Sequence, residues 1–304
     1  MNAASAVNAA SAVNAVSIST AAMLVELSIS TWTGRKLDKR ASQDVTAQNN
    51  ARKGVANVNK KLLGDCAELD AVQKFVANVR NSHYAATMPW SDTGLRLLPT
   101  AQYFTYHNQM TDLQAEFDRL VGVFLQAYGW EIQNAQLKLG DLFNADEYPT
   151  ADSLQHKFKF RLNYIRLADA GDWRLDIEQE AQAALRDQYE KFYQTQFQEA
   201  MGDIWRRAHD ALTKMSEKLD YSDVNSKKIF RDTLVSNVMD IVSLMDACNI
   251  TKDPAMTDAQ NRIRYALQGI TPDALREDAH LRAETKRQVD EVRRIIDNLP
   301  GLGF

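Results

Sequence analysis

The sequence is poor in residues that interrupt regular structure and in residues that cross-link it. Its 304 residues include 12 glycines, 6 prolines and 2 cysteines. Sparse glycine and proline leave long stretches without turn signals, which favours helices. Two cysteines, Cys66 and Cys248, are too few for a secreted disulfide framework, so we expect both to be reduced, buried thiols. No run of about 18 uncharged apolar residues is present, so we expect no transmembrane helix.

Signatures of catalysis are also missing. The sequence has no GxxxxGK[ST], GxGxxG or GxSxG motif. Its five histidines form no HxH, HxxxH or HExxH pattern and none is close in sequence to a cysteine, so the spacing predicts no metal site and no cofactor. Acidic residues alternate with lysine and arginine at helical spacings, which is typical of solvated ion-pair faces. The pattern favours an interaction or assembly protein over an enzyme, and it provides no catalytic residue.

Charge is distributed unevenly along the chain. The net charge of −4 is too mild to indicate a partner. Residues 33 to 63, however, hold eight basic side chains against only Asp38 and Asp44. The eight are Arg35, Lys36, Lys39, Arg40, Arg52, Lys53, Lys60 and Lys61. This local excess predicts an anion-binding surface.

Three regions are expected along the chain. Residues 1–22 repeat the unit NAASAV and predict a low-complexity, disordered tail. Residues 23–175 mix strand and helix patterns, which predicts an α+β portion with a small antiparallel sheet. Residues 176–304 are almost purely helical in pattern and predict a bundle or hairpin of long antiparallel helices. The predicted fold class is therefore mainly α.

Two segments alternate in the manner of half-buried strands. Val25, Leu27 and Ile29 alternate with polar residues, and residues 157–166 place Phe158 and Phe160 opposite a basic side. That basic side consists of Lys157, Lys159 and Arg161. Because the aromatic side chains point the other way, one face cannot both stack bases and hold phosphates. The two interpretations left open are a nucleic-acid contact and an edge strand protected by lysines.

Helical periodicity accounts for most of the remaining chain. Polar helical sequence is expected between residues 35 and 63, and one long helix from Thr100 to about Leu139. A coiled-coil-like seam at spacings of three and four follows, and a last helix runs from 271 to about 299. The seam consists of Met201, Ile204, Ala208, Leu212, Met215 and Leu219. It could pack within the chain or against a partner.

The loop NSHYAATMPWSDTG concentrates His83, Trp90 and Asp92. Exposed aromatic residues anchor interfaces, so the loop is a candidate recognition site. The alternative is structural, with Trp90 filling a gap between helix and sheet and Asp92 shaping the turn before Gly94.

One segment resembles a known family. LVELSISTWTGRKLDKRAS, residues 24–42, is similar to the opening of an uncharacterised family of tailed phages and integrative conjugative elements, whose members begin near the position of Met23. The resemblance continues through MPWSDTGLRLLP and the helical C-terminal half. Such proteins are encoded near a MoxR-type AAA+ ATPase and a von Willebrand A-domain protein. The resemblance implies an adaptor or substrate role in an ATPase-driven system, and it brings no catalytic residues.

The leading hypothesis is a non-enzymatic phage or mobile-element accessory protein in the cytoplasm of a bacterial host. It would act through a protein partner, such as an AAA+ ATPase, or through self-association, and without a membrane. The alternative is a nucleic-acid-associated protein that uses the basic segment and the basic strand face. A third hypothesis is a hydrolase with a site near His83, Trp90 and Asp92. The candidate binding residues are Arg35, Lys36, Lys39, Arg40, Trp90, Asp92, Lys157, Lys159 and Arg161.

Overall fold

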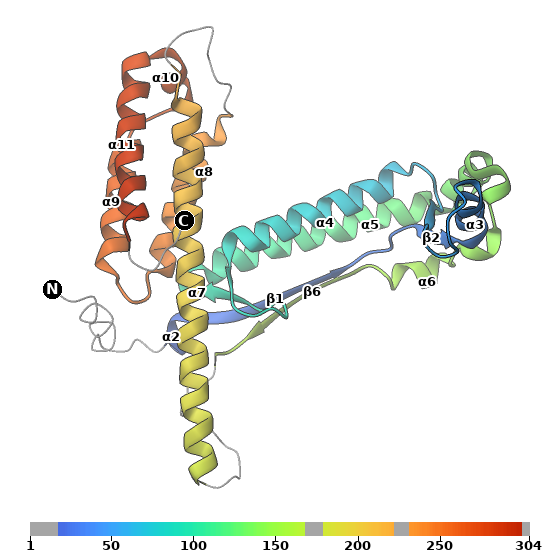
Figure 1. Cartoon of the computed structure of the whole chain (residues 1–304), viewed down its shortest axis with the longest axis horizontal. Coiled ribbons are helices and arrows are strands. Elements are labelled where there is room, and N and C mark those ends of the chain that lie inside the picture. Colours follow the sequence, from blue (N-terminus) through green and yellow to red (C-terminus); the bar gives the residue numbers. More distant parts are fainter. Residues whose placement is uncertain (1–17, 168–178, 222–230, 300–304) are drawn as a thin grey trace. The chain divides into compact units, whose positions relative to one another are not determined.

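A computed structural model of the chain describes residues 18–167, 179–221 and 231–299. It is mainly helical, with a small antiparallel sheet near the N-terminus and long helices in the C-terminal half, as the sequence predicted (Figure 1). None of the described helices is both long and apolar enough to cross a membrane. The chain divides into two compact units built from separate segments. Unit 1 comprises Met1–Glu26, Ala85–Phe104 and Tyr164–Phe304, and unit 2 comprises Leu27–Tyr84 and Thr105–Asn163.

The main sheet has four strands in the order β4-β5-β1-β6. The strands are β1 (Ala22–Ser30), β4 (Met88–Pro89), β5 (Arg96–Pro99) and β6 (Lys159–Ile165). β1 pairs antiparallel with β5 in a register that sets Met23 opposite Leu98, and β4 pairs antiparallel with β5. This order leaves β6 at an edge of the sheet.

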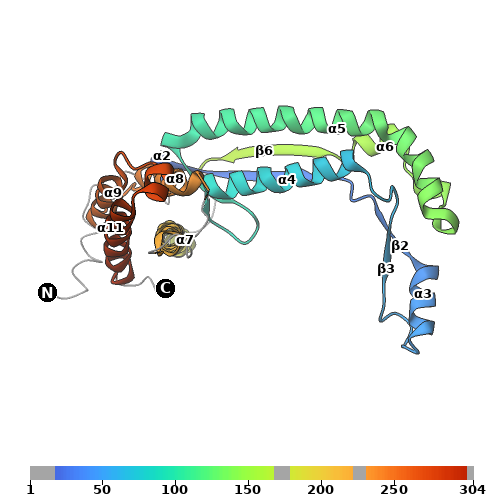
Figure 2. The same ribbon diagram turned by 90° about the horizontal axis from the view of Figure 1, so that it is seen from above.

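Two long helices cover one face of the ribbon formed by β1 and β6 in unit 2. They are α4 (Ala67–Ala86) and α5 (Tyr103–Leu139), which lie side by side (Figure 2). The core beneath them is aromatic: the Phe124 ring lies 6.2 Å from Trp32 and 5.6 Å from Phe158, centroid to centroid. Shorter elements η1 (Thr100–Gln102), η2 (Gly140–Leu142), η3 (Ala145–Glu147) and α6 (Ala151–Gln155) flank α5 in sequence.

Residues Arg35–Lys61, here called the wing, form a separate small sheet in unit 2. Strands β2 (Arg35–Asp38) and β3 (Val58–Lys61) pair antiparallel, and α3 (Lys39–Gln48) lies between them in sequence. The polar helical sequence expected over this segment is confirmed for α3 and wrong for β2 and β3. Two residues prevent a longer helix: Gly34 turns the chain with a φ of 62°, and the Asp38 side chain accepts a hydrogen bond from the Ala41 amide at 2.9 Å. Asp38 thereby caps a helix that begins only at residue 39.

Unit 1 contains the long C-terminal helices. These are α7 (Gln179–Leu219), α8 (Thr233–Cys248), α9 (Pro254–Leu267), α10 (Pro272–Glu277) and α11 (Ala279–Asp297), and the short α2 (Ile18–Ala21) precedes β1. α7 packs against α8 and α11, and α9 packs against the same two helices (Figure 1). The expected last helix is interrupted at Asp278, whose carboxylate accepts hydrogen bonds from the His280 and Leu281 amides and starts α11.

The seam on α7 is buried within the chain. Ile204, Ala208, Leu212, Met215 and Leu219 are each at most 2% exposed and belong to one core with residues of α8, α9 and α11. Of the two interpretations of this stripe, packing within the chain is the one the structure shows for these side chains.

Two expected boundaries differ from the structure. Residues 1–17 of the expected tail lie outside the described residues, but Ile18–Ala21 is helical and Ala22 is buried in β1 opposite Pro99. The division expected near residue 175, itself outside the described residues, does not match the two units. Met88, Trp90 and Leu97 share the core of α7, so β4 and β5 group with the C-terminal helices.

Candidate nucleic-acid interface

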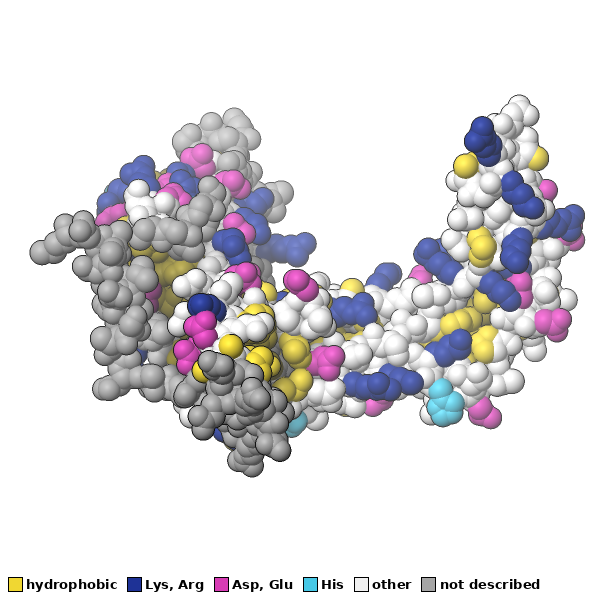
Figure 3. All heavy atoms as spheres, turned by 60° about the horizontal axis from the view of Figure 1, so that its bottom comes forward, with side chains coloured by type: hydrophobic (Ala, Val, Ile, Leu, Met, Phe, Trp, Pro, Cys, Tyr) yellow, Lys and Arg dark blue, Asp and Glu magenta, His cyan; other side chains and the backbone are white. Residues whose placement is uncertain are grey.

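The wing presents nearly all of its basic side chains to solvent. Its pairing and its short helix leave seven of the eight exposed: Arg35, Lys36, Lys39, Arg40, Arg52, Lys53 and Lys61. Figure 3 shows Lys and Arg side chains gathered over the wing, at the right of the view. The structure thus brings together the four wing residues that the sequence selected and adds Arg52, Lys53 and Lys61. The same charge run contained all seven, so local charge density was the signal for the added three.

The eighth basic residue, Lys60, points inward and holds the wing together. Its Nζ lies 2.7 Å from Glu147 Oε2 and 3.3 Å from Asp38 Oδ2, and it donates a 2.7 Å hydrogen bond to the Leu142 carbonyl. Burial opposes the charge of Lys60, but the hydrogen bonds to Glu147 and Asp38 outweigh it, so the pKa of Lys60 is raised. Lys60 thereby ties β3 to Asp38 of β2 and to Glu147 of η3, and Glu147 also lies 3.8 Å from the exposed Lys36.

A second basic surface lies on the uncovered face of β6. Lys159 and Arg161 are exposed on one side of β6, where alternate residues are about 6.6 Å apart. Lys157 is also exposed, but it lies in the turn just before β6, so the strand expected from residue 157 begins at residue 159. The alternate residues point into the core, where Phe158 packs on Phe124 and Phe160 packs on Phe117 of α5. Figure 3 shows basic side chains along this part of unit 2 in the same view as the wing. The edge position of β6 also agrees with the expected lysine-protected edge strand.

Most of these cations lack acidic partners. Among the described residues, no ion pair involves Arg35, Lys39, Arg40, Arg52, Lys53, Lys157, Lys159 or Arg161, whereas Lys36 and Lys61 each have an acidic group 3.8 Å away. Many basic residues of unit 1 differ: Arg207, Arg262 and Arg287 are paired with Asp203, Asp258 and Glu284 one helical turn away. Unpaired cations clustered on one surface create a positive field that attracts anions.

The loop residues selected from the sequence do not join this surface. Trp90 is only 3% exposed and lies in the core of unit 1, where its ring centroid is 5.7 Å from that of Tyr193. This is the structural role that the sequence left open as the alternative, and it removes Trp90 as an exposed anchor. Asp92 is exposed in the turn that closes on Gly94. An acid there would repel rather than bind an anionic partner.

His83 has a structural environment as well. It is 3% exposed in unit 2, and its Nδ1 is 2.7 Å from the Tyr106 hydroxyl. Trp90 belongs to unit 1, so the residues of the hydrolase hypothesis are divided between the two units. A buried, hydrogen-bonded histidine of this kind is a core residue that links α4 to α5.

No family model, curated protein or solved structure matches this chain. The resemblance to the phage and mobile-element family therefore stays a prediction.

Proposed function

We propose that this protein binds nucleic acid through the wing and the basic face of β6. The observation that carries the proposal is the set of exposed cations on these two surfaces of unit 2 that have no acidic partner among the described residues. Such surfaces bind the phosphate groups of nucleic acids, because each phosphate that a lysine or arginine neutralises releases a condensed counterion and so favours binding.

The orientation of the aromatic residues defines the mode of binding. Phe158 and Phe160 are packed against α5, so β6 offers cations and no stacking platform. Recognition that relies on phosphates positions the polymer without reading bases. The expected binding is therefore independent of base sequence and strongly weakened by salt.

The test compares two variants of equal charge. Lys39→Ala/Arg40→Ala removes a lysine and an arginine from the wing, and Arg206→Ala/Lys214→Ala removes the same pair of residue types from exposed positions on α7. Binding to a labelled oligonucleotide of mixed sequence is measured by fluorescence anisotropy at low salt. The wing variant should bind on the order of 10-fold more weakly, and the α7 variant should match the wild type.

Binding by both variants as tight as that of the wild type would contradict the proposed interface. A loss of similar size in both would show that net charge alone matters. Circular dichroism of each variant confirms that the helices are intact before binding is measured.

A second candidate is the accessory role through protein contacts. The seam on α7 was a possible partner-binding surface for this role, but its side chains pack within the chain. A different observation favours it: Leu37, Val45 and Val55 of the wing are large apolar side chains exposed to 44%, 38% and 68%. Apolar residues surrounded by cations suit a partner with an acidic, partly apolar surface. An AAA+ ATPase as that partner, and the phage or mobile-element setting, stay predictions.

The two candidates separate in a nuclease-treated pull-down with the tagged chain. A protein recovered after nuclease, and lost with Leu37→Asp/Val55→Asp but retained with Lys39→Ala/Arg40→Ala, would favour the accessory role. Nucleic acid that is recovered before nuclease and lost with the charge variant would favour the first candidate.

A further inference from the structure

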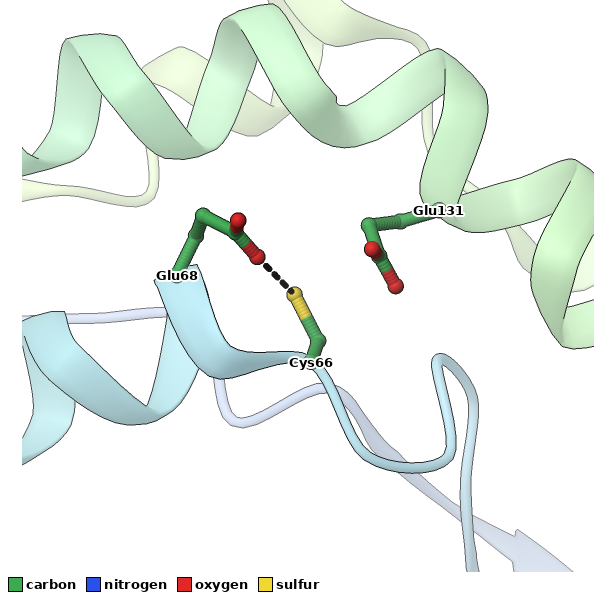
Figure 4. Close-up of side chains that lie close together, drawn as sticks. All are labelled: Cys66, Glu68 and Glu131. Atoms are coloured by element: carbon green, nitrogen blue, oxygen red, sulfur yellow. Dashed lines mark hydrogen bonds between the residues drawn. The ribbon is translucent and has the colours of Figure 1, made fainter.

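A thiol and two carboxylates converge where α4 begins, apart from the basic surfaces. Cys66 lies immediately before α4, Glu68 is in its first turn, and Glu131 projects from α5 toward them (Figure 4). One ligand atom from each residue lies within 4.8 Å of the other two. The Cys66 thiol donates to Glu68 Oε2 across 3.6 Å.

Glu131 is the unusual member of this cluster. It is only 4% exposed, and its Oε2 is buried without a hydrogen-bond partner among the described residues. Burial raises the pKa of Glu131, although the charge of Lys138 opposes the shift. The Lys138 ammonium is itself occupied by the Asp65 carbonyl, to which it donates at 3.0 Å. A buried carboxylate that has an oxygen without a partner and lies beside a thiol and a second carboxylate has the surroundings of a ligand without its cation.

We propose that Cys66, Glu68 and Glu131 bind a divalent transition-metal cation, with zinc as the best fit. Ideal tetrahedral zinc, with Zn–S of about 2.3 Å and Zn–O of about 2.0 Å, sets sulfur and oxygen ligands about 3.5 Å apart. The 3.6 Å separation of Cys66 Sγ from Glu68 Oε2 is close to this value, and a Glu131 oxygen lies within 4.8 Å of both atoms. The thiolate disfavours magnesium and calcium, and the two carboxylates favour a divalent ion over monovalent copper.

Binding has a defined proton balance. Burial, together with the charges of Glu131 and Glu68, raises the pKa of the Cys66 thiol to about 11, so the metal-free residue carries its proton at neutral pH. The S–H proton leaves to solvent as the Zn–S bond forms, and Glu131 loses its proton as well where it is protonated. Zinc affinity should therefore rise with pH, and at least one proton should be released for each ion bound.

The ion would connect two parts of unit 2. Cys66 and Glu68 lie just after β3, and Glu131 lies in the C-terminal half of α5, so coordination ties the β3–α4 junction to α5. Three protein ligands leave one position of a tetrahedral ion for water. The inference does not depend on the proposed nucleic-acid binding.

The test uses the full chain, zinc and cobalt. Calorimetric titration with Zn²⁺ should show one site for each chain, with proton release measured in buffers of different ionisation enthalpy. Cys66→Ser and Glu131→Gln should each weaken binding on the order of 100-fold or more, since loss of even an outer partner of a ligand costs 10–100-fold. Cys248→Ser is the matched control, because Cys248 is also a buried free thiol and should leave the affinity unchanged.

Substitution with Co²⁺ gives a readout that depends on the Cys66 thiolate. Near-ultraviolet absorption from thiolate-to-cobalt charge transfer should appear with the wild type and with Cys248→Ser, and be absent with Cys66→Ser. A chain that binds neither metal, or one whose Cys66→Ser and Glu131→Gln variants bind as tightly as the wild type, would overturn the proposal. Cobalt binding without the charge-transfer band would also overturn it, because it would place the ion away from the thiol.

Discussion

Lys60 and Lys61 are adjacent in sequence and have opposite roles. Lys60 is 9% exposed and ion-paired with Glu147 and Asp38, whereas the Lys61 side chain is 55% exposed and has only Asp65 nearby at 3.8 Å. Alternation along β3 is the cause, since neighbouring side chains point to opposite faces. The buried Lys60 is the nearest cation to both carboxylates, whereas the exposed Lys61 is accessible to a ligand.

Substituting these two lysines should therefore separate stability from binding. Lys60→Ala should lower the free energy of unfolding of unit 2 by about 3 kcal/mol, because it removes the nearest cation from the Asp38 and Glu147 carboxylates. Lys61→Ala should change it by less than about 0.5 kcal/mol. Urea denaturation, with hydrogen exchange of the wing amides to locate the loss, measures both. Equal stability of the two variants would contradict the structural role of Lys60.

Single residues also mark where sequence reasoning ends. The sequence predicted that Cys66 is a buried thiol, and the structure agrees. It could not predict that Glu131 approaches Cys66, because the two are separated by the whole of α4 and much of α5. Metal-ligand spacing in sequence detects ligands that share an element, whereas these ligands meet only through the packing of α4 on α5.

The wing is the element whose stability should depend most clearly on pH. A hydrogen bond from the Ala41 amide, and further the Lys60 ammonium, lower the pKa of Asp38 below its ordinary 3.8. The pKa of Lys60 is raised above 10.5. A carboxylate whose pKa is lowered by folding stabilises the fold at pH values above its unfolded pKa, and this stabilisation is lost as the pH falls through its folded pKa. A lysine whose pKa is raised by folding stabilises the fold at pH values below its unfolded pKa, and this stabilisation is lost as the pH rises through its folded pKa. The wing should be most stable between about pH 4 and pH 10.

Asp38→Asn tests this pH window, since asparagine still caps a helix but carries no charge. The wild type should exceed the variant in denaturation midpoint at about pH 5 to 9. The difference should shrink as the pH falls below the ordinary 3.8 and Asp38 becomes protonated. Asp44→Asn, at an exposed position on α3, is the control and should show no such profile. A difference that persists unchanged to pH 2 would contradict the ionic role of Asp38.

Elements with strong periodicity were predictable from the sequence, and short polar ones were not. Alternation located β1 and β6, and apolar stripes located α5 and α7, because each of these elements buries one continuous face. The wing was taken for helix because β2 and β3 have four residues each, too few to show a period, and they pair only after α3 has intervened. The break at Asp278 was missed because the apolar stripe continues on both sides of a capping residue.

At the scale of the whole molecule, a net charge of −4 conceals two kinds of surface. The helices of unit 1 carry many cations that are paired with carboxylates on the same or neighbouring helices, such as Arg207, Arg262 and Arg287. Most of the exposed cations on the wing and beside β6 in unit 2 have no such partner among the described residues, apart from Lys36 and Lys61. Net charge predicted no partner, whereas the distribution of unpaired charge is the basis of the proposed nucleic-acid binding. The sequence located the run of basic residues, whereas only the structure shows which of these cations have acidic partners.

The most direct measurement is the salt dependence of binding to a labelled single-stranded oligonucleotide. The logarithm of the association constant should fall linearly with the logarithm of salt concentration, by about 0.7 for each phosphate neutralised. Lys157→Ala/Lys159→Ala/Arg161→Ala should reduce the magnitude of the slope by about 2. The matched control Arg206→Ala/Lys214→Ala/Lys218→Ala, on exposed positions of α7, should leave it unchanged. Binding that is insensitive to salt, or a slope that the β6 variant does not alter, would contradict the proposed interface.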